Sequence, residues 1–427
     1  MDLEFENEKV HVKVTKKPAC LVELNITTSS LLTEEAKNKA IKNVKKEISI
    51  SGFRKGKAPD SYIITNYPKE IEAEWKNELA NLSFLEAEKL VKIYPLSYSE
   101  RISYNLKKYS EEGAELTFTF ETEPTVPTID IKKFKLKEVK EKKFELKDVD
   151  ELIRQSRFFY AKWNEVDRPI KLGDYVILDI EALDVNPPKK IFSDVRFEIK
   201  EKSVANWMKD VLIDAKKNDI IETISKPDKD LPKEEKTEFE EKRVRITVKK
   251  IEEAILPPLD DSFAKKMGKN NVEDLKKAVE ELIKKMNKEK ILKDKIDQIN
   301  QFLLKNYPLD LPKSLLEIEF KTKKEELLKN PEFKKDWDLK NIEEKKEIEK
   351  FILNDSRDAV TLIYLIRKIF QDEKIKIEEK EIKEKSIEIM KEKMKKPEIK
   401  TIPQEYLALA FSRLCMEKVY DHILKNC

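Results

Sequence analysis

The sequence contains 427 residues, of which 41% are charged and 39% are hydrophobic, and its 88 Lys and Arg nearly balance its 85 Asp and Glu. The length predicts two to four domains at roughly 100–200 residues each, and the net charge of +3 argues against a chain that acts chiefly by binding polyanions, although a local basic patch is compatible with it. Only five glycines occur, against about 30 in an average chain of this length, which argues against glycine-rich phosphate loops as an organising theme and favours helix.

Residues 1–120 have the pattern of an α+β domain. Hydrophobic and polar residues alternate in four segments, as expected for strands with one exposed face. Two further segments have the apolar spacing of amphipathic helices. In chain order we predict strand 10–15, strand 20–26, a helix that follows Thr33 with its apolar stripe over 36–48, a helix with its stripe over 71–85, strand 101–109 and strand 114–123.

An extended linker is predicted after this domain, at residues 121–149. Two prolines lie near its start, and alternating residues over 129–145 favour an extended chain. Asp148, with Glu151 three residues later, resembles a capping box and predicts a helix that begins there. The apolar stripe of this helix is expected to include Phe159.

The rest of the chain divides into a β-rich region and a helical region. Strands predicted at 175–183 and 243–251 make residues 150–252 a small, mostly β domain. From 253 to 427 nearly every segment has helical periodicity, for example the apolar stripe over 272–286. Prolines interrupt these helices too often for one continuous coiled coil.

Residue types that bind metals or form disulfides are few. The three cysteines are far apart in sequence or terminal: Cys20, Cys415 and Cys427. The two histidines, His11 and His422, have no partners at ligand spacing, so we expect no disulfide framework, metal site or organic cofactor. The first residues lack the apolar core of a secretion signal, and the longest strongly apolar run, 359–366, is shorter than the about 18 residues of a membrane span. These features predict a soluble protein of the reducing cytosol.

One loop departs from the pattern of helices and solvated charge: Gly52-Phe53-Arg54-Lys55-Gly56-Lys57-Ala58-Pro59. Glycine permits positive φ, so the residues between the two glycines can project from a tip. An exposed Phe can enter a shallow apolar pocket while the adjacent Arg and Lys meet carboxylates or phosphates. An ordinary charged turn is the alternative interpretation. The final proline suits the first turn of a following helix.

Every fixed position of the signature Gly-Phe-Arg-x-Gly-Lys-x-Pro is present at 52–59, so the chain resembles the trigger factor family, ribosome-associated bacterial chaperones. Gly173-Asp174-Tyr175 resembles the start of the family's isomerase domain, and residues 256–263 resemble its end. The resemblance implies a multidomain α+β fold with four parts in this order: ribosome-docking α+β domain 1–120, linker 121–149, FKBP-like β domain 150–252, and mainly helical chaperone domain with arms 253–427.

The resemblance also implies partners and contact residues. The N-terminal domain is expected to dock on the large ribosomal subunit near the nascent-chain exit, through Gly52, Phe53, Arg54, Lys55, Gly56 and Lys57. The C-terminal helices are expected to hold nascent and unfolded polypeptides in the cytoplasm without ATP and without membrane contact, and free molecules to form homodimers. Candidate client contacts, with packing inside the protein as the alternative for each, are Leu282, Met286, Leu315, Ile318 and Phe320.

The middle domain resembles FKBP-type peptidyl-prolyl isomerases, which enclose an X-Pro bond in apolar walls and lower its rotation barrier of roughly 18–20 kcal/mol. Trp207 is expected at the floor of a pocket whose candidate residues are Phe192, Phe197, Val204, Ala205, Trp207 and Ile246. The family's glycines around this pocket are replaced, and the stretch 227–242 lacks the expected aromatic flap. We therefore expect weak or absent isomerase activity; the alternative is a protein that acts mainly as a peptidyl-prolyl cis–trans isomerase on unfolded chains.

Overall fold

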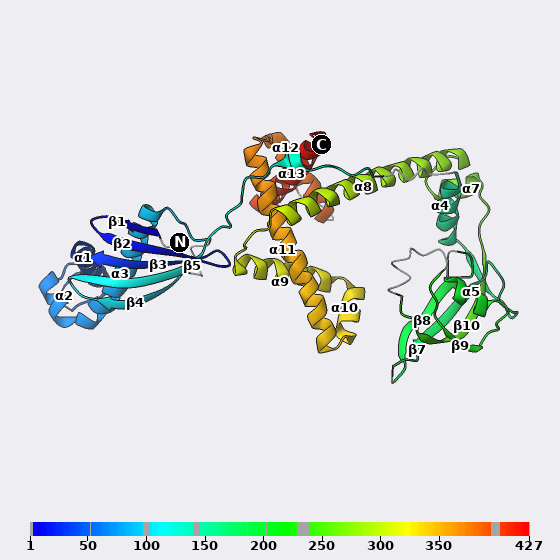
Figure 1. The fold of residues 1–427 in the computed structure, drawn as a ribbon, viewed down its shortest axis with the longest axis horizontal. Coiled ribbons are helices and arrows are strands. Elements are labelled where there is room, and N and C mark those ends of the chain that lie inside the picture. Colours follow the sequence, from blue (N-terminus) through cyan, green and yellow to red (C-terminus); the bar gives the residue numbers. More distant parts are fainter. Residues whose placement is uncertain are drawn as a thin grey trace. The chain divides into compact units, whose positions relative to one another are not determined.

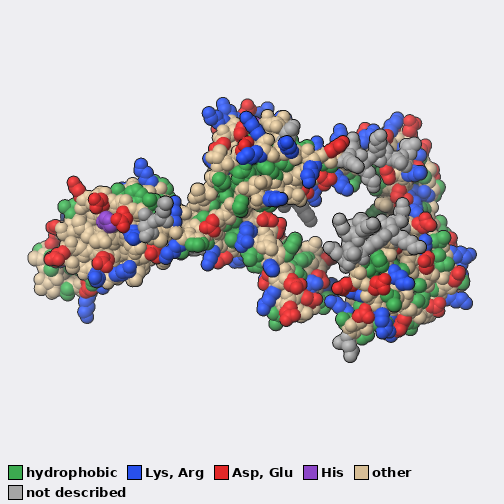
Figure 2. Space-filling model, in the orientation of Figure 1, with side chains coloured by type: hydrophobic (Ala, Val, Ile, Leu, Met, Phe, Trp, Pro, Cys, Tyr) green, Lys and Arg blue, Asp and Glu red, His purple; other side chains and the backbone are tan. Residues whose placement is uncertain are grey.

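The computed structural model describes residues 3–51, 53–96, 102–139, 146–185, 187–201, 203–228, 239–393 and 402–426 (Figure 1). The chain forms two compact units, the first unit (Met1–Glu138 and Asp294–Cys427) and the second unit (Val139–Lys293). The range 253–427 is therefore shared, with 253–293 in the second unit. On the face seen in Figure 2, cationic and anionic side chains are interspersed on each unit, in keeping with the balanced composition.

The N-terminal part of the first unit is an antiparallel sheet in the order β1-β2-β3-β5-β4, with three helices. Its elements are β1 (Leu3–Glu6), β2 (Val10–Lys17), β3 (Leu21–Ser29), α1 (Ser30–Glu47), α2 (Asp60–Asn66), α3 (Pro68–Val91), β4 (Ser103–Tyr109) and β5 (Gly113–Glu121). Alternate strand residues such as Val12, Leu24 and Phe120 are buried against α1 and α3, because period-two alternation places them on one face of the sheet. This confirms the expected α+β character of the region.

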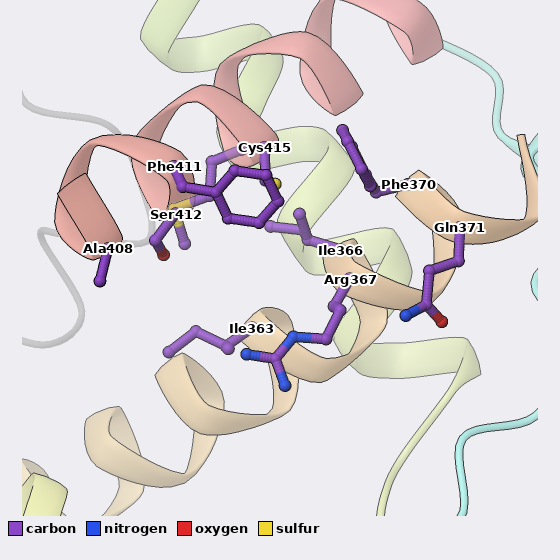
Figure 3. A pocket seen from close by; sticks show the side chains of 10 residues that line it. Ile363, Ile366, Arg367, Phe370, Gln371, Ala408, Phe411, Ser412 and Cys415 are labelled. Carbon is purple, nitrogen blue, oxygen red and sulfur yellow. The ribbon is translucent and has the colours of Figure 1, made fainter. Parts of the chain in front are cut away.

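The remainder of the first unit is helical. It contains the end of α8 (Val272–Asn306), then α9 (Lys313–Lys329), α10 (Pro331–Leu339), α11 (Ile342–Asp372), α12 (Glu379–Lys393) and α13 (Gln404–Lys425). Residues of α8, α11 and α13, including Leu303, Leu365 and Val419, share one core. A cavity of about 420 Å³ lies between α11 and α13 (Figure 3). Among the described residues no helix combines the length and the apolar character that a membrane crossing requires.

The predicted extended linker is partly wrong. A short 3₁₀ helix, η1 (Ile131–Lys133), interrupts it, and α4 begins at Leu146, before its predicted end; the other described residues of 122–139 form no helix or strand, and 140–145 lie outside the described residues. Ile129, Ile131 and Phe134 are buried in the core of the C-terminal helices. The alternation of apolar residues at 129–134 therefore marks the side of this segment that packs on the C-terminal helices. Packing along helices buries one side of a chain just as packing in a sheet does.

The second unit is built on a five-stranded antiparallel sheet in which β6, β10, β7 and β8 follow in order and β9 also pairs with β10. Its elements are α4 (Leu146–Phe158), β6 (Lys162–Glu165), β7 (Tyr175–Ala182), β8 (Lys189–Glu198), α5 (Asn206–Leu212), β9 (Ile220–Ile224), β10 (Arg243–Ile255), α7 (Asp261–Lys266) and the first part of α8. Leu178, Leu212 and Val248 lie in its core. The mainly β character expected for this region is confirmed.

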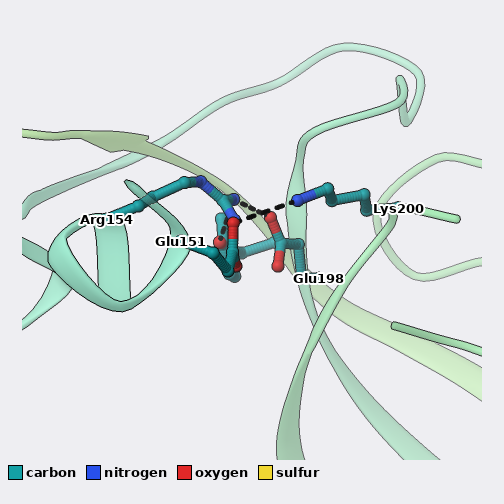
Figure 4. Close-up of polar contacts among 5 residues, drawn as sticks. Glu151, Arg154, Glu198 and Lys200 are labelled. Carbon is teal, nitrogen blue, oxygen red and sulfur yellow. Dashed lines mark hydrogen bonds and ion pairs between the residues drawn. The ribbon is translucent and has the colours of Figure 1, made fainter. Parts of the chain in front are cut away.

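Helix α4 begins before the expected capping box, with Asp148 already in its first turn. Arg154 forms ion pairs with Glu151 of the same helix and with Glu198 of β8 (Figure 4). Lys200 lies 3.7 Å from Glu151. These contacts fasten α4 to the sheet of its unit. Phe159, expected on the buried stripe, is 90% exposed because the helix ends one residue earlier.

Candidate functional site

The loop between α1 and α2 presents the predicted docking side chains to solvent. Phe53 is 40% exposed, and the side chains of Arg54, Lys55 and Lys57 are also exposed. Within the part of the chain that the structure describes, none of these three cations forms an ion pair. The Phe53 ring lies 5.6 Å from the ring of Tyr62 on α2, at a tilt of 50°. An aromatic pair with unpaired cations beside it is suited to a partner that is both apolar and anionic.

The backbone of this loop is ordered by turns. Gly56 has a φ of +76°, a left-handed conformation that glycine adopts without a Cβ penalty. The N–H groups of Phe53 and Lys57 each donate to the carbonyl three residues earlier, at 3.1 and 2.9 Å. Gly52 lies outside the described residues. The exposed side chains are therefore presented on successive turns.

A small core beneath the loop holds it to the helices. Ala58, at the end of the loop, and Ile63 of α2 are buried in this core. Its buried members are Ile41, Val44, Ile50, Ala58, Ile63 and Ile71. An ion pair of 2.7 Å between Lys45 of α1 and Asp60 of α2 lies alongside. Apolar anchoring at both ends of the loop reduces the entropy lost when it binds. Sequence reasoning missed this core and Tyr62, because neither belongs to the signature.

A cavity of about 550 Å³ in the second unit contains part of the predicted isomerase pocket. Phe192, Phe197 and Trp207 all line it, and the Phe192 and Phe197 rings meet edge to face at 5.6 Å. The other apolar residues that line it are Ile180, Ile191, Met208, Phe239 and Val244. Its size and its mainly apolar lining are those of a ligand pocket.

The remaining pocket candidates do not line this cavity. Val204 and Ile246 are buried in the core of the unit, and Ala205 is the N-cap of α5. The stretch 227–242, which we expect to lack an aromatic flap, contributes Phe239 to the lining of the cavity; residues 229–238 lie outside the described residues. Val244 could have been found from the sequence, because it lies two residues before Ile246 and so faces the same side of β10.

The candidate client residues differ in exposure. On α8, in the second unit, Met286 is 55% exposed and Leu282 is nearly as open. On α9, in the first unit, Ile318 is 57% exposed, whereas Leu315 and Phe320 are half-buried. The alternative that these apolar residues serve to pack the protein's own interior therefore does not explain Leu282, Met286 and Ile318. It explains in part Leu315 and Phe320, which are half-buried. The structure divides the five residues between the two units.

Titratable groups with displaced pKa values lie outside these surfaces. Burial, and then the neighbouring Asp310, raises the pKa of the Cys20 thiol to about 11. Burial, and then a hydrogen bond with Glu198, raises the pKa of Tyr175. Among the described residues no group of three or more His, Cys, Asp or Glu side chains is placed to hold a metal ion.

Two family models match the chain. The model for "Bacterial trigger factor protein (TF)" matches residues 10–156, and the model for "Bacterial trigger factor protein (TF) C-terminus" matches residues 271–425. The trigger factor of Protochlamydia amoebophila (strain UWE25) is 27% identical over 388 residues, which cover 88% of this chain and 86% of that protein. The trigger factor of Chlamydia pneumoniae is 25% identical over 438 residues, which cover 100% of this chain and 98% of that protein.

A solved structure also resembles this fold. It is described as "Promiscuous Substrate Recognition in Folding and Assembly Activities of the Trigger Factor Chaperone", and it shares 20% identity with this chain at a TM-score of 0.50. The match covers 97% of this chain and 99% of that one. The likeness concerns the fold, which agrees with the expected multidomain α+β class. On the family models and the relatives together, the chain belongs to the trigger factor family of chaperones.

Proposed function

We propose that this chain is an ATP-independent holding chaperone of the cytoplasm, which docks on the large ribosomal subunit beside the nascent-chain exit. The observation that carries the docking proposal is the loop at 53–57, where exposed Phe53 stands beside three cations without ion-pair partners among the described residues. A ribosomal surface is rich in phosphates and carboxylates. Arg offers a planar fork to such groups, and Lys offers a compact charge.

Docking and holding divide over different parts of the chain. We propose that residues 1–120 dock, that 121–149 connect, and that 253–427 hold clients. Exposed Leu282, Met286 and Ile318 support the client role, because scattered apolar contacts bind many sequences weakly and release them. We also propose that free molecules form homodimers, which light scattering at rising concentration tests.

The cavity beside Trp207 supports a second role for residues 150–252. Its aromatic lining suits an apolar segment next to proline, so we propose that this domain binds prolyl segments of clients and isomerises them weakly. An isomerisation assay on a prolyl peptide tests this role. Turnover at the level of an active FKBP-type enzyme would contradict the weak activity and favour the alternative that isomerisation is the main task.

Replacement of Phe53, Arg54 and Lys55 by alanine tests the docking role. We expect the variant to lose co-sedimentation with ribosomes while its far-UV circular dichroism stays unchanged. A matched control replaces one exposed aromatic and two exposed cations on α11: Lys346, Lys350 and Phe351. The control should bind as the unaltered chain does, and binding of the unaltered chain should weaken with salt. Undiminished binding of the loop variant would refute the docking proposal.

A further inference from the structure

Within the first unit, the part that ends with β5 and the helical part meet at a small polar contact that belongs to none of the surfaces described above. On the side of the sheet lie Cys20, in the tight turn between β2 and β3, and Glu121, at the end of β5. On the side of the helices lie Asp310, just before α9, and Ser314, in the first turn of α9. We call these four residues the junction, and the two parts that they join the sheet part and the helical part.

Hydrogen bonds cross the junction in both directions. The backbone N–H of Cys20 donates to Asp310 Oδ2 at 3.2 Å, and the Cys20 thiol donates to the Asp310 carbonyl at 3.1 Å. Because burial, and then Asp310, raises the pKa of this thiol to about 11, the thiol keeps the proton that it donates at neutral pH. The backbone N–H of Ser314 donates to both carboxylate oxygens of Glu121, at 3.4 and 3.3 Å. Each part therefore supplies both donors and acceptors to the other.

The local structure on each side of the junction depends on the other side. The N-cap of α9 is Pro312, whose side chain cannot accept a hydrogen bond from the first turn. The Glu121 carboxylate takes this role, and a negative charge also suits the N-terminus of a helix. In the turn between β2 and β3, Ala19 and Cys20 have φ of 62° and 55°, left-handed values that are unfavourable for residues other than glycine. Strained backbone persists where surrounding contacts hold it, so the bonds to Asp310 help to fix this turn.

The hydrophobic cores on the two sides of the junction are separate. Among the described residues, the core of the N-terminal sheet and the core of the C-terminal helices have no residue in common. Opening of the junction therefore leaves both cores intact. Hydrogen bonds that water can replace contribute modestly to stability, so a contact of this kind can open locally while the rest of the protein stays folded.

The chain that connects the two parts contains a short segment suited to act as a hinge. The backbone N–H of Thr122 donates to the Cys20 carbonyl at 2.9 Å, which keeps Thr122 with the sheet part. Val126 packs against the core of the C-terminal helices. Between these two anchors, the backbone of residues 123–125 forms no hydrogen bond with any described residue. Hinges in proteins are typically a few loop residues of this kind, which absorb changes in φ and ψ.

We propose that the junction is a latch: it holds the sheet part on the helical part, it opens as one unit, and it lets the sheet part turn about residues 123–125 while both cores stay folded. Because α9 begins at the junction, the latch sets whether α9 and the loop at 53–57 move together. A chain that is docked through this loop can then turn its helices without releasing the loop. That consequence rests on the proposed docking function, whereas the latch itself does not and is tested on the free protein.

Hydrogen exchange resolved by residue, measured by NMR on the full chain, tests whether the junction opens as one unit. Glu121→Ala removes the acceptor of the Ser314 amide. It should also speed exchange at the Cys20 amide about three- to tenfold, although the acceptor of that amide is unchanged. Conversely, Asp310→Ala should speed exchange at the Ser314 amide by a similar factor. The Thr122 amide, which is bonded within the sheet part, should keep its exchange rate in both variants.

Two further variants serve as controls. Glu115→Ala removes an exposed carboxylate of the same strand that lies outside the junction, and it should leave exchange at the Cys20 and Ser314 amides unchanged. Glu121→Gln removes the charge with little change in size. If Glu121→Ala loses circular dichroism, Glu121→Gln takes its place and should speed exchange at the Cys20 amide in the same direction by a smaller factor.

NMR relaxation of the backbone amides tests the hinge. In the unaltered chain, the amides of the N-terminal sheet and those of α11 and α13 should report one rotational correlation time. In the double variant Glu121→Ala with Asp310→Ala, the sheet should report a shorter correlation time than the helices do, while the circular dichroism of the protein stays unchanged.

The outcomes separate the latch, the hinge and the docking function. Exchange that speeds only at the amide whose own acceptor is removed would show that the bonds open independently, and it would overturn the latch. A double variant whose sheet and helices still share one correlation time would overturn the hinge. A chain that passes both tests and yet fails to co-sediment with ribosomes would refute docking and leave the latch intact.

Discussion

Truncation of Ile63 to alanine tests whether the small core beneath the loop at 53–57 positions the docking residues. Ile63 is fully buried among the apolar residues that fasten the loop to α1, α2 and α3. It makes no contribution to the exposed face of the loop. The substitution therefore leaves Phe53, Arg54 and Lys55 in the sequence and changes only the support that holds them.

The size of the effect follows from burial. Ile→Ala removes three buried carbon groups, which at about 0.8 kcal/mol each gives roughly 2.4 kcal/mol. A cavity that the neighbours fail to fill adds up to about 2 kcal/mol. We therefore expect the free energy that keeps this small core closed to fall by about 2.5–4 kcal/mol. If the open conformation of the loop becomes favoured by about 1.4 kcal/mol, roughly one tenth of the molecules keep the closed loop that binds the ribosome. The apparent Kd for ribosomes then rises about tenfold.

Two measurements check the prediction. Hydrogen exchange should show loss of protection at the amides of Phe53 and Lys57, which donate within the loop. Co-sedimentation should show weaker ribosome binding. The matched control is Ile26→Ala, the same truncation in the main core of the N-terminal sheet. It should lower the overall free energy of unfolding by a similar amount and leave the ribosome affinity of the folded molecules unchanged.

Either of two results would refute this reasoning. One is a variant Ile63→Ala whose loop amides exchange faster while its ribosome affinity stays that of the unaltered chain. The loop would then bind equally well when loosened, and its preorganisation would contribute nothing. The other is an equal loss of affinity in Ile26→Ala, which would show that general destabilisation is responsible.

Three further predictions concern the backbone, a thiol and an ion pair. Gly56→Ala should destabilise the loop by about 1–2 kcal/mol because of the positive φ at this position. Steric contact adds nothing, since a Cβ there meets no described atom within 4 Å. Unaltered hydrogen exchange of the loop amides would contradict this prediction. In a variant with Cys20 as the single cysteine, the thiol should react slowly with an alkylating reagent at pH 8 and faster as the pH approaches its pKa of about 11. The free energy of unfolding should fall as pH rises from about 9 to 11, because the folded state keeps the thiol proton that the unfolded state releases. Titration of the Cys20 thiol near pH 9 in the folded protein would contradict this prediction. Arg154→Met should cost about 1–3 kcal/mol in urea unfolding by leaving Glu198 without this partner, and a double-mutant cycle with Glu198→Gln should not be additive.

The fold was predictable where apolar periodicity coincides with burial. The strand expected at 20–26 is β3, because every second residue of it faces the helices. Strand β8 was missed because most of its residues are exposed and none is buried, so that no regular alternation marks it. The start of α1 was placed several residues late, since Ser29 is its N-cap and lacks the side-chain hydrogen bond that usually accompanies one. Such boundaries depend on backbone geometry that the sequence pattern does not encode.

The loop at 53–57 and the cavity beside Trp207 differ in how far the sequence could define them. The loop residues are consecutive, so one signature names nearly all of them. The cavity is assembled from β7, β8, α5, β10 and the segment before β10. Resemblance alone pointed to Phe192, Phe197 and Trp207, and it misplaced Ile246, whose side chain lies in the core. Which of two inward-facing residues reaches a cavity is decided by its neighbours in space.

The stripe over 272–286 explains why client surfaces are the hardest feature to predict. Its first residues, Leu275 and Val279, are buried against Val149 and Ile153 of α4, whereas Leu282 and Met286 continue the same periodicity and stay exposed. The sequence pattern is uniform along the stripe, and the positions that are buried are those that share a core with residues of α4 and α7. Leaving such side chains uncovered forgoes up to about 1.5–3 kcal/mol each. That burial energy is available to a polypeptide that covers them, which supports the client contacts that we propose for Leu282 and Met286.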